Sequence, residues 1–89
     1  MILKYVSSFN KDLKKIKDGK LKLNLAKLLI ELKNISTISE IKNLKKMVGY
    51  TVYYRIKIGE YRIGLKIENE TTITFIRFKH RKDIYKVFP

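Results

Sequence analysis

The sequence predicts an α+β fold in which an N-terminal strand and a helical hairpin pack on a small antiparallel sheet, in the order β-α-α-(α)-β-β-β. Two observations support this prediction. Apolar residues recur at helical spacing up to about residue 34, and they alternate with polar residues after Gly49. Because 89 residues are the length of one small domain, we expect residues 1–89 to fold as a single unit.

The first third of the chain predicts a strand and two helices. Residues 2–6 form the strand, and Ser7-Ser8 offers an N-cap for the first helix. We expect Asp18-Gly19 to end that helix, since glycine is favoured just beyond a helix C-terminus. The second helix covers residues 20–34, and one apolar stripe on it faces the core. The stripe consists of Leu21, Leu25, Leu28, Leu29 and Leu32.

Residues 35–49 have a less regular pattern. Thr37 and Glu40 fit a capping box, in which each side chain satisfies a backbone N–H of the other residue. Ile38, Ile41 and Leu44 then follow at roughly helical spacing. This pattern favours a short helix before Gly49.

The last forty residues predict an antiparallel meander. Strands are expected over residues 52–58, 61–68 and 71–78. Gly59-Glu60 fits a two-residue turn of type II′, and Asn69-Glu70 fits a second tight turn. The segment from Arg81 to Phe88 predicts a final turn or short helix.

The charge of the chain points to a polyanionic partner. Twenty-one Lys and Arg residues against eight acids give a net charge of +13. Nucleic acid, the ribosome or an acidic protein would complement that charge, although lysines can also serve solubility alone. All four arginines lie at or after position 55, and the guanidinium fork binds phosphate in a bidentate manner.

Several classes of function are excluded or disfavoured. The chain has no cysteine, which excludes disulfides, thiolate metal sites and cysteine nucleophiles. His80 is the single histidine, which argues against a zinc site or a histidine-based triad. The N-terminal residues lack an apolar signal-peptide core, and no apolar run approaches the roughly 20 residues that span a bilayer. We therefore expect a cytoplasmic protein.

The predicted hairpins bring basic residues onto one face of the sheet. The first turn pairs Lys57 with Arg62, the second pairs Arg62 with Arg77, and Arg55 lies on the same side. Opposed like charges destabilise a sheet by up to about 1 kcal/mol, a cost that a bound polyanion would offset. The alternative is that these side chains merely extend into water.

The two faces are expected to differ in character. Tyr53 and Phe75 lie on the basic face by parity. Both could stack on bases or pack against the C-terminal segment, and for Phe75 we favour the packing role. We expect the basic face to be open to solvent. The other face meets the helices and carries Ile56, Ile58, Tyr61, Ile63, Leu65, Ile67, Ile76 and Phe78.

Two segments resemble a known family. The stretch from Tyr53 to Ile63, YYRIKIGEYRI, resembles the pattern YRIRVGDYRV of RelE/ParE toxins, and the stretch from His80 to Tyr85 resembles their C-terminal HRKxxY segment. With the helical hairpin before them, the resemblance covers nearly the whole chain. It implies a RelE-like fold, and in the RelE branch it implies cleavage of mRNA in the ribosomal A site.

The resemblance also implies roles for individual residues. No cluster of carboxylates is part of this motif, which favours metal-independent chemistry without a cofactor, because hard cations need several oxygen ligands. His80 has two readings, a general acid or base and a structural hydrogen-bond partner. The implied catalytic residues are Arg55, Lys57, Arg62, Arg81, Tyr85 and, if it acts as a general acid or base, His80. The implied RNA-binding residues are Arg77, Tyr53, Lys79 and Lys82.

Family membership alone leaves alternatives open, since one fold can carry several functions. A ParE-like inhibitor of DNA gyrase is the main alternative to the endoribonuclease. A catalytically inert antitoxin-binding homologue and a general RNA-binding module are two others. The expected partners are an acidic antitoxin, which would cover the basic face, together with the ribosome and mRNA.

Overall fold

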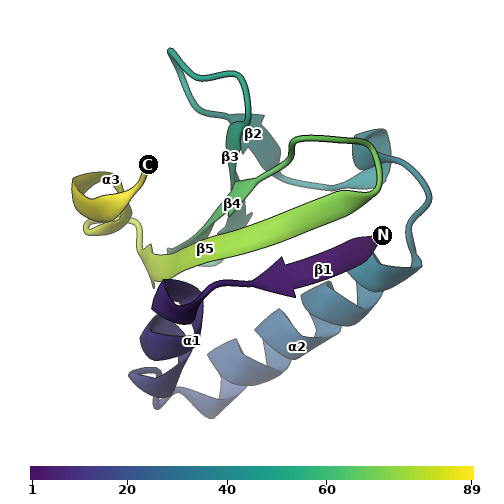
Figure 1. The fold of residues 1–89 in the computed structure, drawn as a ribbon. Helices are drawn as coiled ribbons and strands as arrows, with labels where there is room; N and C mark the ends of the chain where they lie inside the picture. Colours follow the sequence, from purple (N-terminus) through teal and green to yellow (C-terminus); the bar gives the residue numbers. More distant parts are fainter.

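The computed structural model describes residues 1–89, which form a five-stranded sheet flanked by helices. The sheet has the order β1-β5-β4-β3-β2. Helices α1 and α2 cover one side of it, and the short helix α3 lies on the other (Figure 1). The elements are β1 Ile2–Tyr5, α1 Ser7–Lys14, α2 Gly19–Asn34, the 3-10 helix η1 Ile38–Glu40, β2 Leu44–Lys46, β3 Tyr53–Ile58, β4 Tyr61–Lys66, β5 Thr72–His80 and α3 Ile84–Val87.

The α+β class is confirmed, with two differences from the expected order and sheet: an additional strand, β2, precedes the three predicted strands, and the sheet is not wholly antiparallel. β1 pairs with β5 in parallel, so that Ile2 lies opposite Thr72 and Tyr5 opposite Phe75. All other strand pairs are antiparallel, and the sheet is therefore mixed. None of the helices combines the length and the apolar character that crossing a membrane would require.

The boundaries of α1 and α2 correct two sequence predictions. Val6 occupies the N-cap of α1, and the Ser8 hydroxyl donates instead to the Ile76 carbonyl at 2.6 Å. Asp18 is the N-cap of α2, because its carboxylate accepts from the backbone N–H groups of Lys20 and Leu21. Asp18-Gly19 therefore begins the second helix and does not end the first, since the carboxylate satisfies amides that a helix start leaves free.

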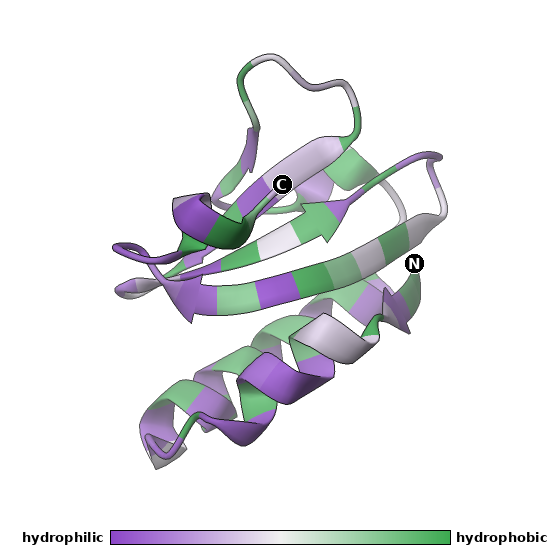
Figure 2. Cartoon of the chain, turned by 60° about the vertical axis from the view of Figure 1, so that its left-hand side comes forward, coloured by the Kyte–Doolittle hydropathy of each residue, from purple (hydrophilic) through white to green (hydrophobic).

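The hydrophobic core lies between α1, α2 and the inner face of the sheet. Phe9 of α1 is fully buried, and Leu25 and Leu32 are the most buried residues of the predicted stripe on α2. Hydrophobic and hydrophilic residues alternate along the strands and around α2 (Figure 2). The sheet contributes Ile56, Ile63, Leu65, Ile73, Phe75 and Phe78 to this core.

Residues 35–49 contain a strand that the sequence did not predict. The capping box of Thr37 and Glu40 is confirmed, but it starts only one 3-10 turn. Asn43 then adopts a φ of +62°, and the chain enters β2, which pairs with β3 at the edge of the sheet. The expected short helix is therefore wrong beyond Glu40.

The hairpin registers are confirmed for one turn and wrong for the other. Lys57 lies opposite Arg62, as predicted. Arg62, however, lies opposite Lys79 and not opposite Arg77. The second loop is longer than two residues, because β4 ends at Lys66 and β5 begins at Thr72. Within this loop the Asn69 side chain accepts the N–H groups of Thr71 and Thr72.

A β-bulge in β5 changes which residues face the core. Gly64 pairs with Arg77 but Leu65 pairs with Phe75, so Ile76 has no partner and the parity of β5 switches there. Phe75 is consequently buried against Phe9, with ring centroids 5.4 Å apart, and does not lie on the basic face. Ile76, which we expected to face inward, is only half-buried.

Leu32→Ala should destabilise the fold by about 2–4 kcal/mol, because truncating a buried leucine loses apolar burial and leaves a cavity. Leu32 is 2% exposed, whereas Leu23 on the same helix is 55% exposed. Leu23→Ala is therefore the matched control, with an expected change below about 0.5 kcal/mol. Urea unfolding of both variants would measure the difference, and equal stabilities would contradict this placement of α2.

Candidate functional site

Basic residues gather on the sheet face that points away from α1 and α2, and five of them lie on the three central strands near Gly64. Lys57, Arg62 and Lys79 form one row across β3, β4 and β5, and Arg55 and Arg77 flank Gly64 in the next row. Directly opposed residues point to the same side of a sheet. We call these five residues the cationic face. The pairing of β4 with β5 is shifted by two residues from the prediction. Because side chains alternate between faces every residue, a shift of two leaves Arg77 on the predicted face. The common face is therefore confirmed, but Arg77 lies opposite Gly64 and not opposite Arg62.

The C-terminal segment covers the middle of the cationic face. Ile84 and Phe88 are 0% and 3% exposed. The Phe88 ring lies over Gly64 and makes an edge contact with Tyr53, at 5.7 Å between ring centroids. Tyr53 is half-buried between Phe88 and Tyr50. The expectation that this whole face is open to solvent is therefore wrong at Gly64 and Tyr53.

Gly64→Ala should detach the C-terminal segment, because an added Cβ would lie only 2.7 Å from the Phe88 ring. We expect a loss of about 1–3 kcal/mol, typical of overpacking, and increased proteolysis after residue 80. Gly19→Ala is the matched control, since nothing lies within 4 Å of its Cβ position. Limited proteolysis and thermal unfolding would measure both variants. A Gly64→Ala protein with wild-type protection would contradict the contact.

A small cavity combines a tyrosine with three cations. Tyr85 of α3, which is 55% exposed, and Arg55 of β3 line it together with Lys45 and Lys46 of β2. The cavity has a volume of about 290 Å³, and Met47 and Val48 complete its wall. The two predicted residues Arg55 and Tyr85 are thus brought together. The lysines were missed because β2 itself was missed, although Lys45 lies directly opposite Arg55.

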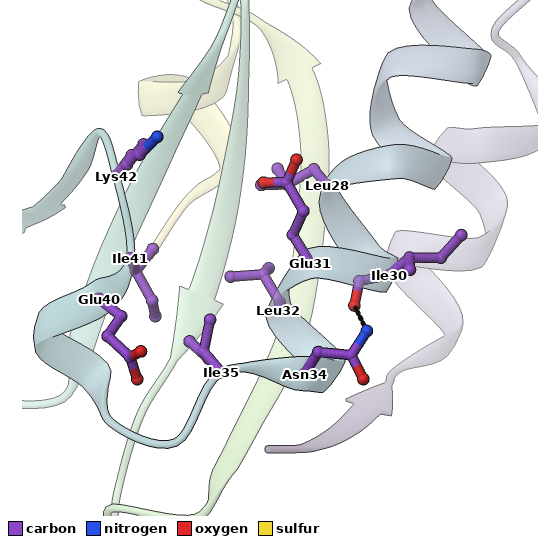
Figure 3. A pocket seen from close by; sticks show the side chains of 9 residues that line it. All are labelled: Leu28, Ile30, Glu31, Leu32, Asn34, Ile35, Glu40, Ile41 and Lys42. Carbon is purple, nitrogen blue, oxygen red and sulfur yellow. Dashed lines mark hydrogen bonds between the residues drawn. The ribbon is translucent and has the colours of Figure 1, made fainter.

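A larger cavity is lined by neither Arg55 nor Tyr85. It has a volume of about 440 Å³ and lies between the C-terminal half of α2 and residues 35–42. Figure 3 shows Leu32, Ile35 and Ile41 pointing into it, and Asn34 turned back to the Ile30 carbonyl. Leu28, Glu31, Glu40 and Lys42 complete the lining. No predicted site residue contributes to this cavity, so its size does not make it the centre of the chemistry.

Arg77 and Lys79 are both held by a buried carboxylate. Asp12 of α1 is 3% exposed and lies 2.8 Å from Arg77 Nε and 3.4 Å from Lys79 Nζ. It also accepts the backbone N–H of Phe78 at 2.9 Å. Burial raises the pKa of Asp12, but the hydrogen bonds from Arg77 and Phe78 and the two positive charges lower it further, so the net pKa lies below the usual range. Arg77 and Lys79 thus have a structural role in joining α1 to β5.

The turn between β3 and β4 binds two arginines. Arg62 donates from one terminal nitrogen to the carbonyls of Gly59 and Tyr61, at 3.0 and 2.9 Å. The Nε atom of Arg81 lies 2.6 Å from a carboxylate oxygen of Glu60, with which it forms an ion pair. The backbone N–H of Arg81 donates to the Glu60 carbonyl. Gly59 has a φ of +57°, which a primed turn requires at its first central position. Glu60 is a further residue that the sequence analysis did not single out.

His80 is separated from the cationic face. It lies directly opposite Tyr61, on the face that meets the helices, and the two rings make an edge contact at 5.5 Å. Its Nδ1 accepts the backbone N–H of Lys82 at 3.1 Å. This geometry fits the structural reading of His80. Lys82 itself is exposed in the turn after β5.

Comparison with known proteins identifies the family. The sequence model described as "ParE toxin of type II toxin-antitoxin system, parDE" matches residues 3–85. The chain belongs to the ParE toxin family. It is a type II toxin of the RelE/ParE superfamily, which confirms the resemblance of its hairpin and C-terminal motifs.

Relatives of this toxin carry the RelE name. Toxin RelE3 of Methanocaldococcus jannaschii is 40% identical over 86 residues, which are 96% of each chain. A chain of the RelB-RelE antitoxin-toxin complex from Methanococcus jannaschii is 37% identical, with a TM-score of 0.80 and coverage of 97% and 99%. The intact E. coli RelBE toxin-antitoxin complex gives a TM-score of 0.66 at 22% identity, with coverage of 89% and 94%, and shows the fold alone.

The toxin's side chains do not form a cluster typical of a metal site. No three His, Asp or Glu side chains gather at any point of the chain. The side chains at the cationic face and in the adjacent cavity carry guanidinium, ammonium and phenol groups. These groups can bind phosphate and stabilise negative charge, which is the requirement of a reaction at phosphorus.

Proposed function

We propose that this toxin is a metal-independent endoribonuclease that cleaves mRNA in the ribosomal A site, and that residues 1–89 act as one toxin domain. The observation that supports the proposal most strongly is the pairing of Lys57 with Arg62 beside the cavity of Arg55 and Tyr85. The RelE names of relatives at 37–40% identity support the same activity.

The chemistry of RNA cleavage fits the groups that are present. The 2′-oxygen attacks phosphorus, the bond from phosphorus to the 5′-oxygen breaks, and a 2′,3′-cyclic phosphate and a 5′-hydroxyl result. A base must take the proton of the 2′-hydroxyl, and an acid must give one to the leaving oxygen. The negative charge that develops on the phosphorane needs fixed cations, and that stabilisation is usually the largest single contribution.

Specific residues suit these tasks. We assign the phosphate to Arg62 and Arg81, whose guanidinium groups flank one turn. Lys57 lies directly opposite Arg62 and is the candidate base. Tyr85 would orient the 2′-hydroxyl or stack on a base, with Arg55, Lys45 and Lys46 around the same cavity. Of the predicted phosphate ligands, Arg77 and Lys79 are the least available, since Asp12 binds both.

A single assay tests the proposal. Purified toxin would be added to ribosomes programmed with an end-labelled mRNA, with and without EDTA, and the products resolved on a sequencing gel. We expect cleavage within the A-site codon that EDTA leaves unchanged. Intact mRNA in the presence of folded toxin would overturn the proposal.

Inhibition of DNA gyrase is the second candidate function. One observation favours it, because the family description that matches residues 3–85 is that of ParE toxins. The matched experiment incubates the toxin with gyrase and supercoiled plasmid. Trapped DNA breaks without mRNA cleavage would establish the gyrase function in place of the nuclease.

We also propose that a cognate antitoxin binds this toxin in the cytoplasm. The RelB-RelE structure, whose matched chain is 37% identical to this toxin, is a complex of toxin with antitoxin. A net charge of +13 favours an acidic partner that covers the cationic face. Co-expression with the neighbouring open reading frame should yield a stable complex by size-exclusion chromatography, and failure to co-purify would contradict this partner.

A further inference from the structure

Two arginines that are 19 positions apart in the sequence meet at one turn of two residues. Arg62 comes from the start of β4, and Arg81 follows the end of β5. Arg62 binds the carbonyls of Gly59 and Tyr61, and Arg81 binds both the carbonyl and the carboxylate of Glu60. The turn therefore fixes the positions of both guanidinium groups relative to each other.

Glu60 differs from the other acids of the chain in its partner. Among the predicted catalytic residues Arg55, Lys57, Arg62, Arg81, Tyr85 and His80, only Arg81 forms an ion pair, and its partner is Glu60. The Arg81 side chain is 55% exposed. Without the carboxylate its four rotatable bonds would be free to populate many conformations in water.

The two terminal nitrogens of the Arg81 guanidinium remain free to bind a ligand. The close contact to Glu60 is made by Nε, and the two terminal nitrogens have no hydrogen-bond partner in the protein. Those two terminal nitrogens could donate to a phosphate while Nε remains in its ion-pair contact with Glu60. A carboxylate that bound the terminal nitrogens would instead occupy the place of the phosphate.

We infer that Glu60 is a positioning residue, which aligns the Arg81 guanidinium with that of Arg62 so that both meet the scissile phosphate. This inference rests on the proposed endoribonuclease function and deepens it. Donors that are already aligned stabilise the transition state without reorganisation, whereas a mobile arginine must be ordered in each turnover. Glu60 itself touches no substrate.

The test compares Glu60→Ala, Glu60→Gln and Glu68→Ala in the ribosome cleavage assay, with kcat and KM measured separately. Both Glu60 variants keep the main-chain bond between Arg81 and position 60, so they change only the side-chain contact with the guanidinium. We expect Glu60→Ala to lower kcat by about 10-fold or more with a change in KM below about 3-fold. Glu60→Gln should retain only part of the rate, because its amide oxygen can take the place of the carboxylate oxygen but carries no negative charge to pair with Arg81.

Glu68→Ala controls for charge. Glu68 is similarly exposed and paired with Lys66 at 3.0 Å, and its removal changes the net charge by the same amount. We expect a wild-type kcat for this variant. A Glu60→Ala rate equal to or above that of Glu68→Ala would overturn the inference, and a higher rate would identify Glu60 as a competitor of the phosphate.

A double-mutant cycle with Arg81→Ala gives a second readout. If Glu60 acts through Arg81, Glu60→Ala should cause no further loss of kcat once Arg81 is absent. The same fractional loss in both backgrounds would overturn the inference. Absence of cleavage by the wild-type toxin would instead overturn the proposed function, and this inference with it, so the two failures are distinguishable.

Discussion

Arg62→Ala should lower the rate of mRNA cleavage by about 10²–10³-fold, the loss typical of removing one donor that stabilises a developing negative charge. Arg62 lies opposite both Lys57 and Lys79, at the centre of the cationic row. Its guanidinium is held by two carbonyls of the adjacent turn and keeps other N–H groups free for a phosphate. The measurement is single-turnover cleavage on programmed ribosomes.

The fold should survive this substitution. The side chain of Arg62 is half-buried and bonds only carbonyl groups at the edge of the molecule, which water can reach after truncation. Arg62→Lys is the informative companion, because it keeps the charge but loses the planar fork, and we expect an intermediate rate. Wild-type cleavage by Arg62→Ala, or an unfolded protein, would contradict a role at the phosphate.

Asp12→Asn should lower the free energy of unfolding by about 2–3 kcal/mol and Tm by about 10–20 °C. The amide removes the negative charge that Arg77 and Lys79 share inside the α1–β5 contact. The loss is smaller than for a fully buried pair, because those two cations are 23% and 26% exposed and can reach water. Thermal unfolding monitored by circular dichroism measures the effect.

The matched control for Asp12 is Asp83→Asn. Asp83 forms an exposed pair with Lys86 at 3.7 Å, and such pairs contribute little. We expect a change in the free energy of unfolding below about 0.5 kcal/mol. If both substitutions cost the same, the buried carboxylate would not be the connection between α1 and β5 that its contacts imply.

Asp12 also predicts how stability depends on pH. The pKa of its carboxyl is lower in the folded protein than in the unfolded chain. Burial raises that pKa, but the hydrogen bonds from Arg77 and Phe78 and the charges of Arg77 and Lys79 outweigh it. Its contribution is therefore fully present above the unfolded pKa of about 3.9 and is lost as pH falls through the folded pKa. Wild-type stability should drop below pH 4 more steeply than that of Asp12→Asn.

Local patterns predicted most of the fold and the centre of the site. Period-two alternation placed β3 and β4, and a two-residue turn with glycine at its first position fixed their register, so the opposition of Lys57 and Arg62 followed directly. The leucine stripe identified α2 and its buried face. Each of these features depends on neighbours in the sequence, which is why a single sequence suffices to predict it.

The features that were missed depend on long-range contacts. The bulge at Ile76 is needed because Phe75 and Phe78 both pack on Phe9, which lies in a different part of the chain. The strand β2 has only three residues and exists through its pairing with β3. Asp12 and Glu60 are ordinary charged residues until tertiary structure brings Arg77 and Arg81 beside them.

The parallel pairing of β1 with β5 has a consequence for biosynthesis. β1 is translated first, yet its partner begins 70 positions later, with Thr72 opposite Ile2. At about 5–20 residues per second, roughly 4–14 seconds separate the two strands on the translating ribosome. A nascent toxin therefore cannot close its sheet until β5 has been made, and the arginine and tyrosine that follow β5 arrive later still. The synthesising ribosome is thus exposed to an assembled toxin only after β5 has been translated.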